Sequence, residues 1–309
     1  MKRLGFFLMI LAAVSIPLFA GGQRASEAIK IAYMGPHQNN EYQVGLRESM
    51  EQYAKQIGVE CVVYIADNDP AKQVSQIEQA IIAGVQGIVI DPCSYEGIYN
   101  GVIAAKNAKI PMVMVHESVS NQDDATAFIG PDFTDGGRQK MTQVMKDLPN
   151  GGNLAILYGP MGHTAQIAIT NGYTEVHEPQ KAKYPYVFEG EGLWEAPKAL
   201  ELASTWLSSG RQIDAFVCNN DGMAIGAMNA VAEVGKAGQI PIYGLDAQQD
   251  VLREIKKGTI RATIRTDSGI EVKEGIDTVL KAIRGDPYRK EYLFPMTLVT
   301  KDNVDQYLK

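Results

Sequence analysis

One stretch of the chain decides its fold: Ala215-Phe216-Val217-Cys218-Asn219-Asn220-Asp221-Gly222-Met223-Ala224-Ile225-Gly226-Ala227-Met228. It predicts a short buried strand that passes through three polar residues directly into an apolar helix. We expect Asp221 to cap that helix, because its carboxylate can accept the N–H groups of the first turn. The amides of Asn219 and Asn220 are then free at the carboxyl end of the strand, where ligands bind in open α/β sheets. An amide both donates and accepts hydrogen bonds, which suits a neutral polar ligand.

Strand and helix signals alternate along the chain from Ile29 onward. The expected strands are apolar throughout, as strands covered on both faces should be. They are Lys30–Met34, Cys61–Ile65, Gly87–Ile90, Met112–Val115, Asn153–Tyr158, Tyr186–Phe188, Ala215–Cys218, Pro241–Gly244 and Arg261–Ile264. Helices are expected between them, among others over 164–177, 195–208, 222–235 and 248–256. Such an alternation predicts an α/β fold with parallel sheets and right-handed crossovers.

The number of strands is too large for one compact sheet, and the alternation breaks near Gly130-Pro131-Asp132. A last expected strand, Tyr292–Val299, contains Pro295, which is awkward inside a sheet and better suits a chain passing between domains. We therefore expect two Rossmann-like lobes, each with a doubly wound parallel sheet, joined by a hinge of three crossings near 131, 266 and 295. The expected limits are residues 27–130 plus 267–295 for the N-terminal lobe and 131–266 plus 296–309 for the C-terminal lobe.

The first residues predict an exported protein. A basic start, Met1-Lys2-Arg3, precedes an apolar run from Leu4 to Ala20, which together form a signal peptide over residues 1–20. The alternative is an uncleaved membrane anchor, but the 17-residue run is broken by Pro17 and is shorter than the roughly 20 residues that a span needs. No cysteine stands directly after the run, where Gly21-Gly22-Gln23 follows, so we expect a cleaved, periplasmic protein that is not a lipoprotein.

Composition narrows the class of partner. The 309 residues are 45% apolar and 21% charged, with a formal net charge of −7. Removal of residues 1–20 takes away Lys2 and Arg3 and leaves 27 basic against 36 acidic residues, a charge of −9. Because no cluster of lysine and arginine interrupts this acidic balance, nucleic acid is not an expected partner.

The sequence lacks the common motifs of cofactor-dependent and hydrolytic enzymes. The first strand ends in Met34-Gly35-Pro36-His37, without the G-x-G-x-x-G of dinucleotide-binding folds. There is also no P-loop, no G-x-S-x-G and no H-E-x-x-H. We expect neither an enzyme nor a cofactor.

Several stretches carry a family resemblance that runs from about Ile29 to Lys301. They are Asn39-Asn40-Glu41-Tyr42, Asn68-Asp69-Pro70, Asn219-Asn220-Asp221-Gly222-Met223-Ala224-Ile225-Gly226-Ala227 and Tyr243-Gly244-Leu245-Asp246. In order and spacing the chain resembles the ribose/galactose-type periplasmic sugar-binding proteins of ABC importers, the type I solute-binding proteins. The resemblance implies capture of a monosaccharide or polyol between the lobes by hinge closure, with delivery to a membrane permease. A role as ligand carrier for a chemoreceptor or sensor is the alternative.

The resemblance also implies which residues contact the ligand. Asn40 and Tyr42 match an asparagine and an aromatic residue of the first loop, and a tyrosine ring can stack on the apolar face of a sugar. Trp194 matches an aromatic residue of the other lobe. Asn220 and Asp246 match its polar ligands, and a carboxylate that accepts two hydroxyls makes charge-assisted hydrogen bonds.

Other positions depart from the family pattern. His116-Glu117 replaces an Asp-Arg pair, Ile167 replaces an arginine, and Thr266 replaces a glutamine near the second crossing, while His163 matches a histidine of galactose-type members. We include His116, Glu117, His163 and Thr266 in the expected site. Loss of the arginines together with the gain of Glu117 leaves a nucleoside, a signalling furanone or a cationic molecule as alternative ligands.

Three histidines are expected at strand ends that face the cleft: His37, His116 and His163. With Glu117 they are ligand types that zinc accepts, so a metal-binding protein is a remote alternative. Their spacing shows no compact metal motif, and we expect these histidines to bind an organic ligand.

Overall fold

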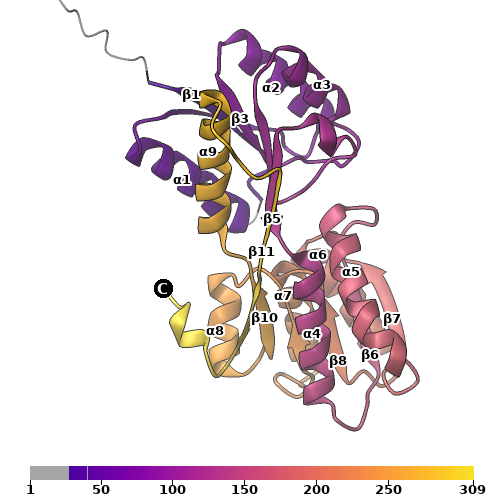
Figure 1. Ribbon diagram of the computed structural model, residues 1–309. Helices are drawn as coiled ribbons and strands as arrows, with labels where there is room; N and C mark the ends of the chain where they lie inside the picture. The colour runs from indigo at the N-terminus through magenta and orange to yellow at the C-terminus, as the bar shows by residue number, and fades with distance from the viewer. Residues whose placement is uncertain (1–27, 40) are drawn as a thin grey trace, which may run out of the picture.

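The structure is a computed structural model and describes residues 28–39 and 41–309. This part of the chain folds into two lobes, each built on a six-stranded sheet with helices on both faces (Figure 1). The predicted signal peptide and Asn40 lie outside the described residues. Within them, no helix is long and apolar enough to cross a membrane.

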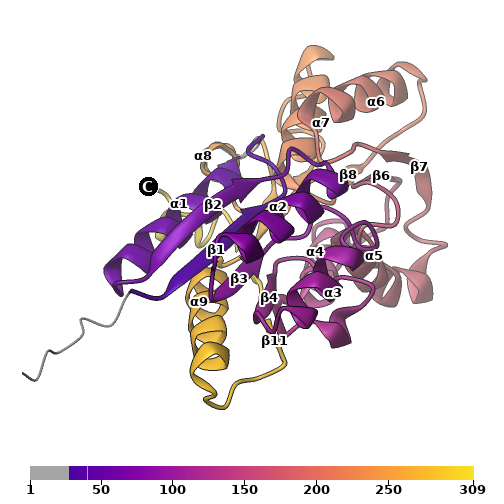
Figure 2. The same ribbon diagram turned by 90° about the horizontal axis from the view of Figure 1, so that it is seen from above.

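The first sheet has the strand order β11-β5-β4-β3-β1-β2, and all of its neighbouring strands are parallel. Its strands are β1 (Lys30–Gly35), β2 (Glu60–Ile65), β3 (Gly87–Ile90), β4 (Met112–Val115), β5 (Ala127–Pro131) and β11 (Glu291–Phe294). Its helices are α1 (Glu41–Gln56), α2 (Pro70–Ile82), α3 (Tyr99–Asn107) and α9 (Ser268–Arg284). Alternate residues of β1 pack on opposite faces: Ile31 and Tyr33 join the core under α1 and α9, whereas Ala32 and Met34 join the core under α2 and α3. Seen from above, β3 and β4 lie between α9 and α3 (Figure 2).

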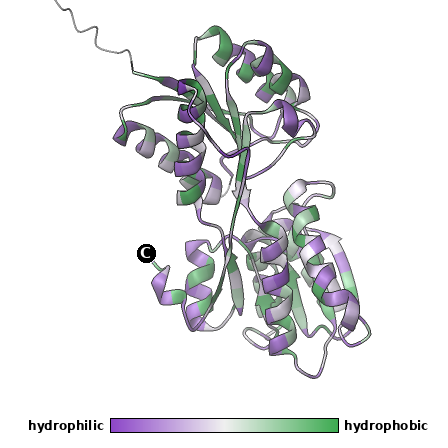
Figure 3. Cartoon of the chain, in the orientation of Figure 1, coloured by the Kyte–Doolittle hydropathy of each residue, from purple (hydrophilic) through white to green (hydrophobic). Residues whose placement is uncertain are grey.

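The second sheet has the order β12-β10-β9-β8-β6-β7 and is parallel except for the pairing of β10 with β12. Its strands are β6 (Leu154–Tyr158), β7 (Tyr186–Glu191), β8 (Ala215–Cys218), β9 (Ile242–Tyr243), β10 (Ala262–Arg265) and β12 (Thr297–Thr300). Its helices are α4 (Phe133–Asp147), α5 (Thr164–His177), α6 (Ala196–Ser208), α7 (Asp221–Glu233) and α8 (Gln249–Lys257). Three short 3-10 helices cover Gln122–Asp124, Glu178–Gln180 and Val304–Gln306. Residues of β8 again alternate, since Phe216 packs under α6 and α7 while Val217 packs under α4 and α5. Figure 3 shows the hydrophobic character of the strands in both lobes.

The chain passes between the two sheets three times: from β5 into α4, from β10 into α9 and from β11 into β12. The prediction of an α/β fold with two doubly wound lobes and three connections is confirmed. At two of the connections an aspartate fixes the start of the next helix. The Asp132 carboxylate accepts a hydrogen bond from the backbone N–H of Asp135, and the Asp267 carboxylate accepts one from that of Gly269.

The structure differs from the predicted strands in two places, although the chain does pass between the lobes at Pro295. The expected strand Tyr292–Val299 is two strands in different sheets, with Pro295 between them, because a proline cannot donate to a continuous ladder. Strand β5 was not predicted, because Gly130-Pro131 indicated a break. The strands Gly87–Ile90, Met112–Val115 and Ala215–Cys218 agree with β3, β4 and β8 to the residue, and the other predicted strands differ only at their ends.

Candidate ligand-binding site

A cavity of about 810 Å³ lies between the carboxyl ends of the strands of both sheets. Its first wall follows β1 to β4 and includes His37, Asn68, Asp91, His116 and Glu117. Its second wall follows β6 to β9 and includes Pro160, His163, Trp194, Asn219, Asn220 and Asp246. The volume is in the range of pockets that enclose a small organic ligand. Both lobes therefore contribute polar side chains to one cavity.

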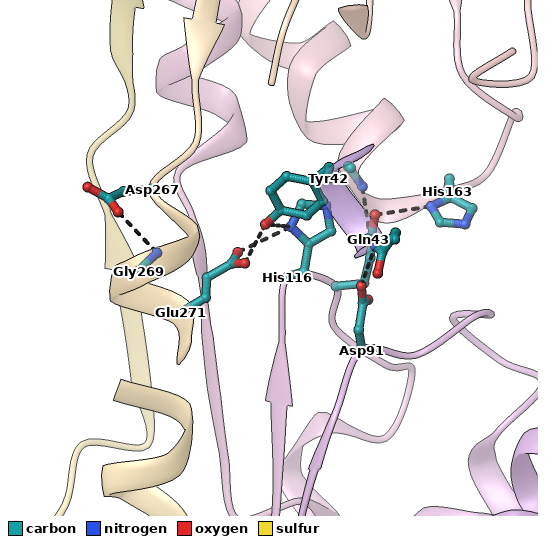
Figure 4. A network of polar contacts seen from close by, with 10 residues as sticks. Tyr42, Gln43, Asp91, His116, His163, Asp267, Gly269 and Glu271 are labelled. Carbon is teal, nitrogen blue, oxygen red and sulfur yellow. Dashed lines mark hydrogen bonds and ion pairs between the residues drawn. The ribbon is translucent and has the colours of Figure 1, made fainter. Parts of the chain in front are cut away.

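Tyr42, His116 and Glu271 form a hydrogen-bonded group in the first wall (Figure 4). The Tyr42 hydroxyl donates to the Glu271 carboxylate and lies 3.0 Å from Nδ1 of His116, while Nδ1 of His116 lies 3.1 Å from Oε1 of Glu271. Burial favours the neutral imidazole, but the Glu271 carboxylate more than offsets this, so the pKa of His116 rises to about 10. His116 is consequently an imidazolium ion at neutral pH, held by a fully buried carboxylate.

Asp91 directly follows β3 and also belongs to the first wall of the cavity. Its Oδ2 accepts a hydrogen bond of 2.7 Å from the Gln43 amide, whereas its Oδ1 is buried without a hydrogen-bond partner among the described residues (Figure 4). Burial raises the pKa of Asp91 to about 7. The Gln73 amide holds the loop, since it donates to the Asp91 carbonyl and accepts from the backbone N–H of Cys93.

The second wall corrects the roles that we expected for the two residues after Asn219. Asn220, not Asp221, is the N-cap of α7: its backbone is extended and its side-chain oxygen accepts from the backbone N–H of Met223. Asp221 is already in the first helical turn, fully buried, and its carboxylate accepts from the Thr263 hydroxyl and the backbone N–H of Gln248. The Asp221 side chain therefore ties the end of β8 to the neighbouring parts of the second lobe.

The other amide groups of this wall hold neighbouring loops. The Asn220 amide also donates to the Trp194 carbonyl at 3.1 Å. Asn219 accepts from the backbone N–H of Gly159 at 3.0 Å and donates to the Tyr173 hydroxyl at 3.3 Å. The two asparagines thus hold the loops after β6 and β7 in place, and both also line the cavity.

Trp194 sits in a loop with a demanding conformation. Both Leu193 and Trp194 have positive φ angles, 56° and 64°, a region that residues with side chains seldom adopt. The indole ring packs directly over the Cα atom of Gly159, where a side chain would collide with it. It also meets the His163 ring edge to face, with the ring centroids 6.1 Å apart.

Asp246 is the most strongly perturbed acid of the second wall. Its φ angle is 123°, and among the described residues its carboxylate has one hydrogen bond, a long one of 3.4 Å from the Gln248 amide. Burial and then the nearby Asp221 carboxylate raise the pKa of Asp246 to about 8. The buried ammonium of Lys140 opposes this shift, but it donates to the Cys218 carbonyl, 2.5 Å away.

Glu117 joins the two lobes across the cavity. Its Oε1 lies 3.1 Å from Nδ1 of His163, and its Oε2 accepts a hydrogen bond from the backbone N–H of Ala165 in the first turn of α5. A carboxylate at this place is favoured by the partial positive charge of the helix N-terminus. Burial alone would lower the pKa of His163, but Glu117 raises it. A second contact between the lobes is the edge-to-face packing of His116 on Phe133.

The structure brings most of the predicted site residues together. The ones that line the cavity are Tyr42, His116, Glu117, His163, Trp194, Asn220 and Asp246. Thr266 does not: it is buried, and its hydroxyl oxygen has no hydrogen-bond partner in the described part of the chain. Asn40 lies outside the described residues. Whether these residues bind a ligand stays a prediction.

Sequence reasoning missed Asp91, Gln43, Phe133 and Gln248 in the lining and the buried partner Glu271. Asp91 could have been found, because it directly follows a predicted strand, as His116 does. Glu271 carried no local signal, since it lies on a helix 155 residues after His116.

The three histidines at the cavity do not form a metal centre among the described residues, where no group of three or more His, Cys, Asp or Glu side chains could hold a metal ion. Instead, the Nδ1 atoms of His116 and His163 contact carboxylates. Burial, and then the positive charges of these two, lower the pKa of His37.

Comparison with known families identifies the fold. Residues 31–287 match the family described as the periplasmic binding protein domain. The chain belongs to this family. Its members are substrate-binding proteins and not enzymes, and membership indicates a periplasmic protein.

Similar proteins cover nearly the same length. A xylitol-binding protein of Mycolicibacterium smegmatis is 32% identical over 263 residues, 84% of this chain and 74% of the relative. The ribose import binding protein of Bacillus subtilis is 27% identical over 85% of this chain and 84% of its own. A crystal structure of an ABC transporter solute-binding protein from Bacillus halodurans with bound myo-inositol is 29% identical, with a TM-score of 0.86 over 92% of this chain and 98% of the other.

Proposed function

We propose that this periplasmic binding protein captures a small polyhydroxylated ligand, a monosaccharide or a polyol, and delivers it to the membrane permease of an ABC importer. One observation carries the proposal: both lobes line a single cavity of about 810 Å³ with amides, imidazoles and carboxylates. Such groups match the alternating donors and acceptors of vicinal hydroxyls. The similar proteins support the same ligand class: one is named for xylitol, one for ribose import, and the crystal structure contains bound myo-inositol.

The contacts suggest how binding is coupled to a change of shape. Tyr42, His116 and Asp91 belong to the first lobe, and Trp194, Asn220 and Asp246 to the second. A ligand that touches both sets stabilises the closed arrangement over an open one, because only the closed lobes offer both walls at once. The closed surface would then be recognised by the permease.

We take the N-terminal lobe as residues 27–130 plus 267–295 and the C-terminal lobe as residues 131–266 plus 296–309. We also propose that residues 1–20 are removed on export.

Isothermal titration calorimetry of the mature protein tests the ligand class. The panel consists of ribose, galactose, xylitol, myo-inositol and ribonucleosides, with Zn²⁺ as a separate titrant. We expect a Kd in the micromolar range or below for at least one sugar or polyol. Heat from Zn²⁺ alone, with none from the organic compounds, would refute the proposal.

Two variants then test the site with the compound that binds. Trp194→Ala and Asp246→Ala should each weaken binding at least tenfold, whereas Asp305→Asn, an exposed residue paired with Lys256, should not change it. Affinities within threefold of wild type in both cavity variants would show that the ligand binds elsewhere.

N-terminal sequencing of the periplasmic protein should find a start near Gly21, and an intact Met1 there would contradict cleavage.

A further inference from the structure

Acidic side chains outnumber basic ones in the lining of the cavity. Of the described residues that line it, five are acidic and none is a lysine or an arginine. The acidic ones are Asp91, Glu117, Glu195, Asp246 and Asp250. Positive charge comes only from histidines, and each of the two imidazoles with a raised pKa already contacts a carboxylate.

Glu117 is the acid that first suggested a cationic ligand, but it is not available for one. Both of its oxygens are occupied, by the His163 ring and by the backbone N–H of Ala165. The same holds for Glu271, which contacts His116 and Tyr42. The ion pairs within the wall therefore neutralise these two carboxylates.

Asp91 and Asp246 form no ion pair with any of the described residues, although His116 acts on both from a distance. Asp91 is 1% exposed, receives one amide hydrogen bond on Oδ2, and has no partner for Oδ1 among the described residues. Within the described part of the chain, the Asp246 carboxylate has only the long contact with the Gln248 amide. A buried carboxylate without a cationic partner is costly, and this cost disappears when an opposite charge arrives in hydrogen-bonding geometry.

We infer that the ligand carries a protonated amine, so that it is an amino-substituted sugar or polyol, and that Asp91 is the residue that recognises the ammonium group, with Asp246 as the second carboxylate. This inference rests on the proposed function and names the class of ligand for the same cavity. An ammonium group has three donors and no acceptor, which fits a carboxylate oxygen that lacks a donor. A hydroxyl at the same place would donate one hydrogen bond but leave the charge of the carboxylate unbalanced.

The arrangement also predicts how protons move on binding. Burial raises the pKa of Asp91 to about 7, against the opposing effects of His116 and Gln43 and with smaller contributions from Glu117 and Glu271. Burial and then Asp221 raise that of Asp246 to about 8, opposed by His116, Lys140 and Gln248. An arriving ammonium group favours the ionised carboxylates, so at pH 7 protons leave the protein. A neutral polyol causes a smaller release or none.

Matched pairs of compounds provide the test. Xylitol and myo-inositol are titrated at pH 7 beside their amino-deoxy analogues, in which one hydroxyl is replaced by an amine, and beside the N-acetyl derivatives, which lack the charge. For wild type we expect at least one amino-deoxy analogue to bind ten times more tightly than its parent, and its N-acetyl derivative to lose that gain. Titration in two buffers of different ionisation enthalpy should show proton release with the amine.

Variants assign the effect to Asp91. Asp91→Asn keeps the shape and an oxygen for the Gln43 amide, and should lower the preference for the amine to threefold or less and reduce the proton release. Asp305→Asn, which removes an exposed carboxylate of the second lobe, should keep the preference of wild type. Circular dichroism and urea denaturation show whether the Asp91→Asn protein is folded. The comparison of compounds on wild type does not depend on this variant.

The outcomes separate this inference from the function beneath it. If wild type binds the neutral polyols at least as tightly as every amino-deoxy analogue, the inference is overturned and the proposed function stands. If Asp91→Asn keeps the wild-type preference for the amine over the parent polyol, Asp91 is not the residue that recognises the ammonium group. If no sugar, polyol or amino derivative binds, the proposed function itself fails.

Discussion

The Nδ1 atom of His163 lies 3.1 Å from Oε1 of Glu117, and this ion pair connects the two lobes at the edge of the ligand cavity. The second oxygen of Glu117 binds the backbone N–H of Ala165 at the start of α5. One side chain of the first lobe thus makes two charge-assisted contacts with the second lobe. Because these contacts exist only while the lobes are together, they favour the closed state.

Glu117→Gln should therefore weaken ligand binding by about fivefold, because the apparent affinity falls with the population of the closed state. The measurement is calorimetric titration of the compound identified by the panel. Glu175→Gln is the matched control, since it removes a carboxylate whose partner, Arg138, lies within the second lobe. Equal affinities of Glu117→Gln and wild type would mean that the ion pair does not influence closure.

The same ion pair predicts how the affinity of a neutral ligand varies with pH. Glu117 overcomes the effect of burial and raises the pKa of His163 above 6.5 when the lobes are together. The contribution to closure is then complete below about pH 6.5 and is lost as the pH rises through the raised value. The Kd of wild type should increase between pH 6 and pH 8.5, and this increase should be smaller in His163→Asn. A steeper dependence in the variant would contradict the assignment.

Glu271 should matter for stability more than for ligand contact, because it is fully buried and neutralises the His116 imidazolium. Glu271→Ala leaves that charge without a partner and should lower the free energy of unfolding by about 3 kcal/mol. Glu274→Ala on the same helix is the control: its contact with Lys273 is 4.0 Å long and partly exposed, so a change within about 0.5 kcal/mol is expected. Urea denaturation of both variants measures the difference, and equal losses would contradict it.

Much of this architecture follows from local sequence. Strands such as Met112–Val115 are short apolar runs buried on both faces, and the polar residue that follows a parallel strand lies at the ligand edge of its sheet. This rule found His116 and Asn220, whereas Asp246 came from the family resemblance. The rule cannot predict Glu271, because this residue lies on a helix. Glu271 contacts His116 only because the second connection returns the chain to the first lobe.

The sequence predicted Asp221 as the helix cap, whereas the cap in the structure is Asn220, and this error has a different cause. Both residue types cap helices well, so the composition of the stretch cannot decide between them. Asn220 is the cap because helical geometry begins one residue later, and the Asp221 carboxylate then meets Thr263 and the Gln248 backbone, which come from distant parts of the chain. Tertiary partners, not local preference, determined the assignment.

Two substitutions at Asn220 separate its structural role from its role in the site. Asn220→Ser keeps a hydroxyl for the backbone N–H of Met223 but loses the amide that holds the Trp194 carbonyl, so binding should weaken about tenfold with little loss of stability. Asn220→Ala loses both and should also lower the free energy of unfolding by about 1 kcal/mol. Titration and urea denaturation of the two proteins give the comparison. An Asn220→Ser protein that binds like wild type would exclude a role for the amide in the site.

Gly159 provides a test of the aromatic part of the cavity. The Trp194 indole packs against the Cα atom of Gly159, and a β-carbon there would overlap ring atoms, so Gly159→Ala should displace the ring. We expect at least a tenfold loss of affinity together with a shift in tryptophan emission, because the only other tryptophan, Trp206, is buried in the core of the second lobe. Gly45→Ala is the control, since its β-carbon would have no neighbour within 4 Å. Unchanged emission and affinity in Gly159→Ala would show that Trp194 tolerates a different position and does not shape the site.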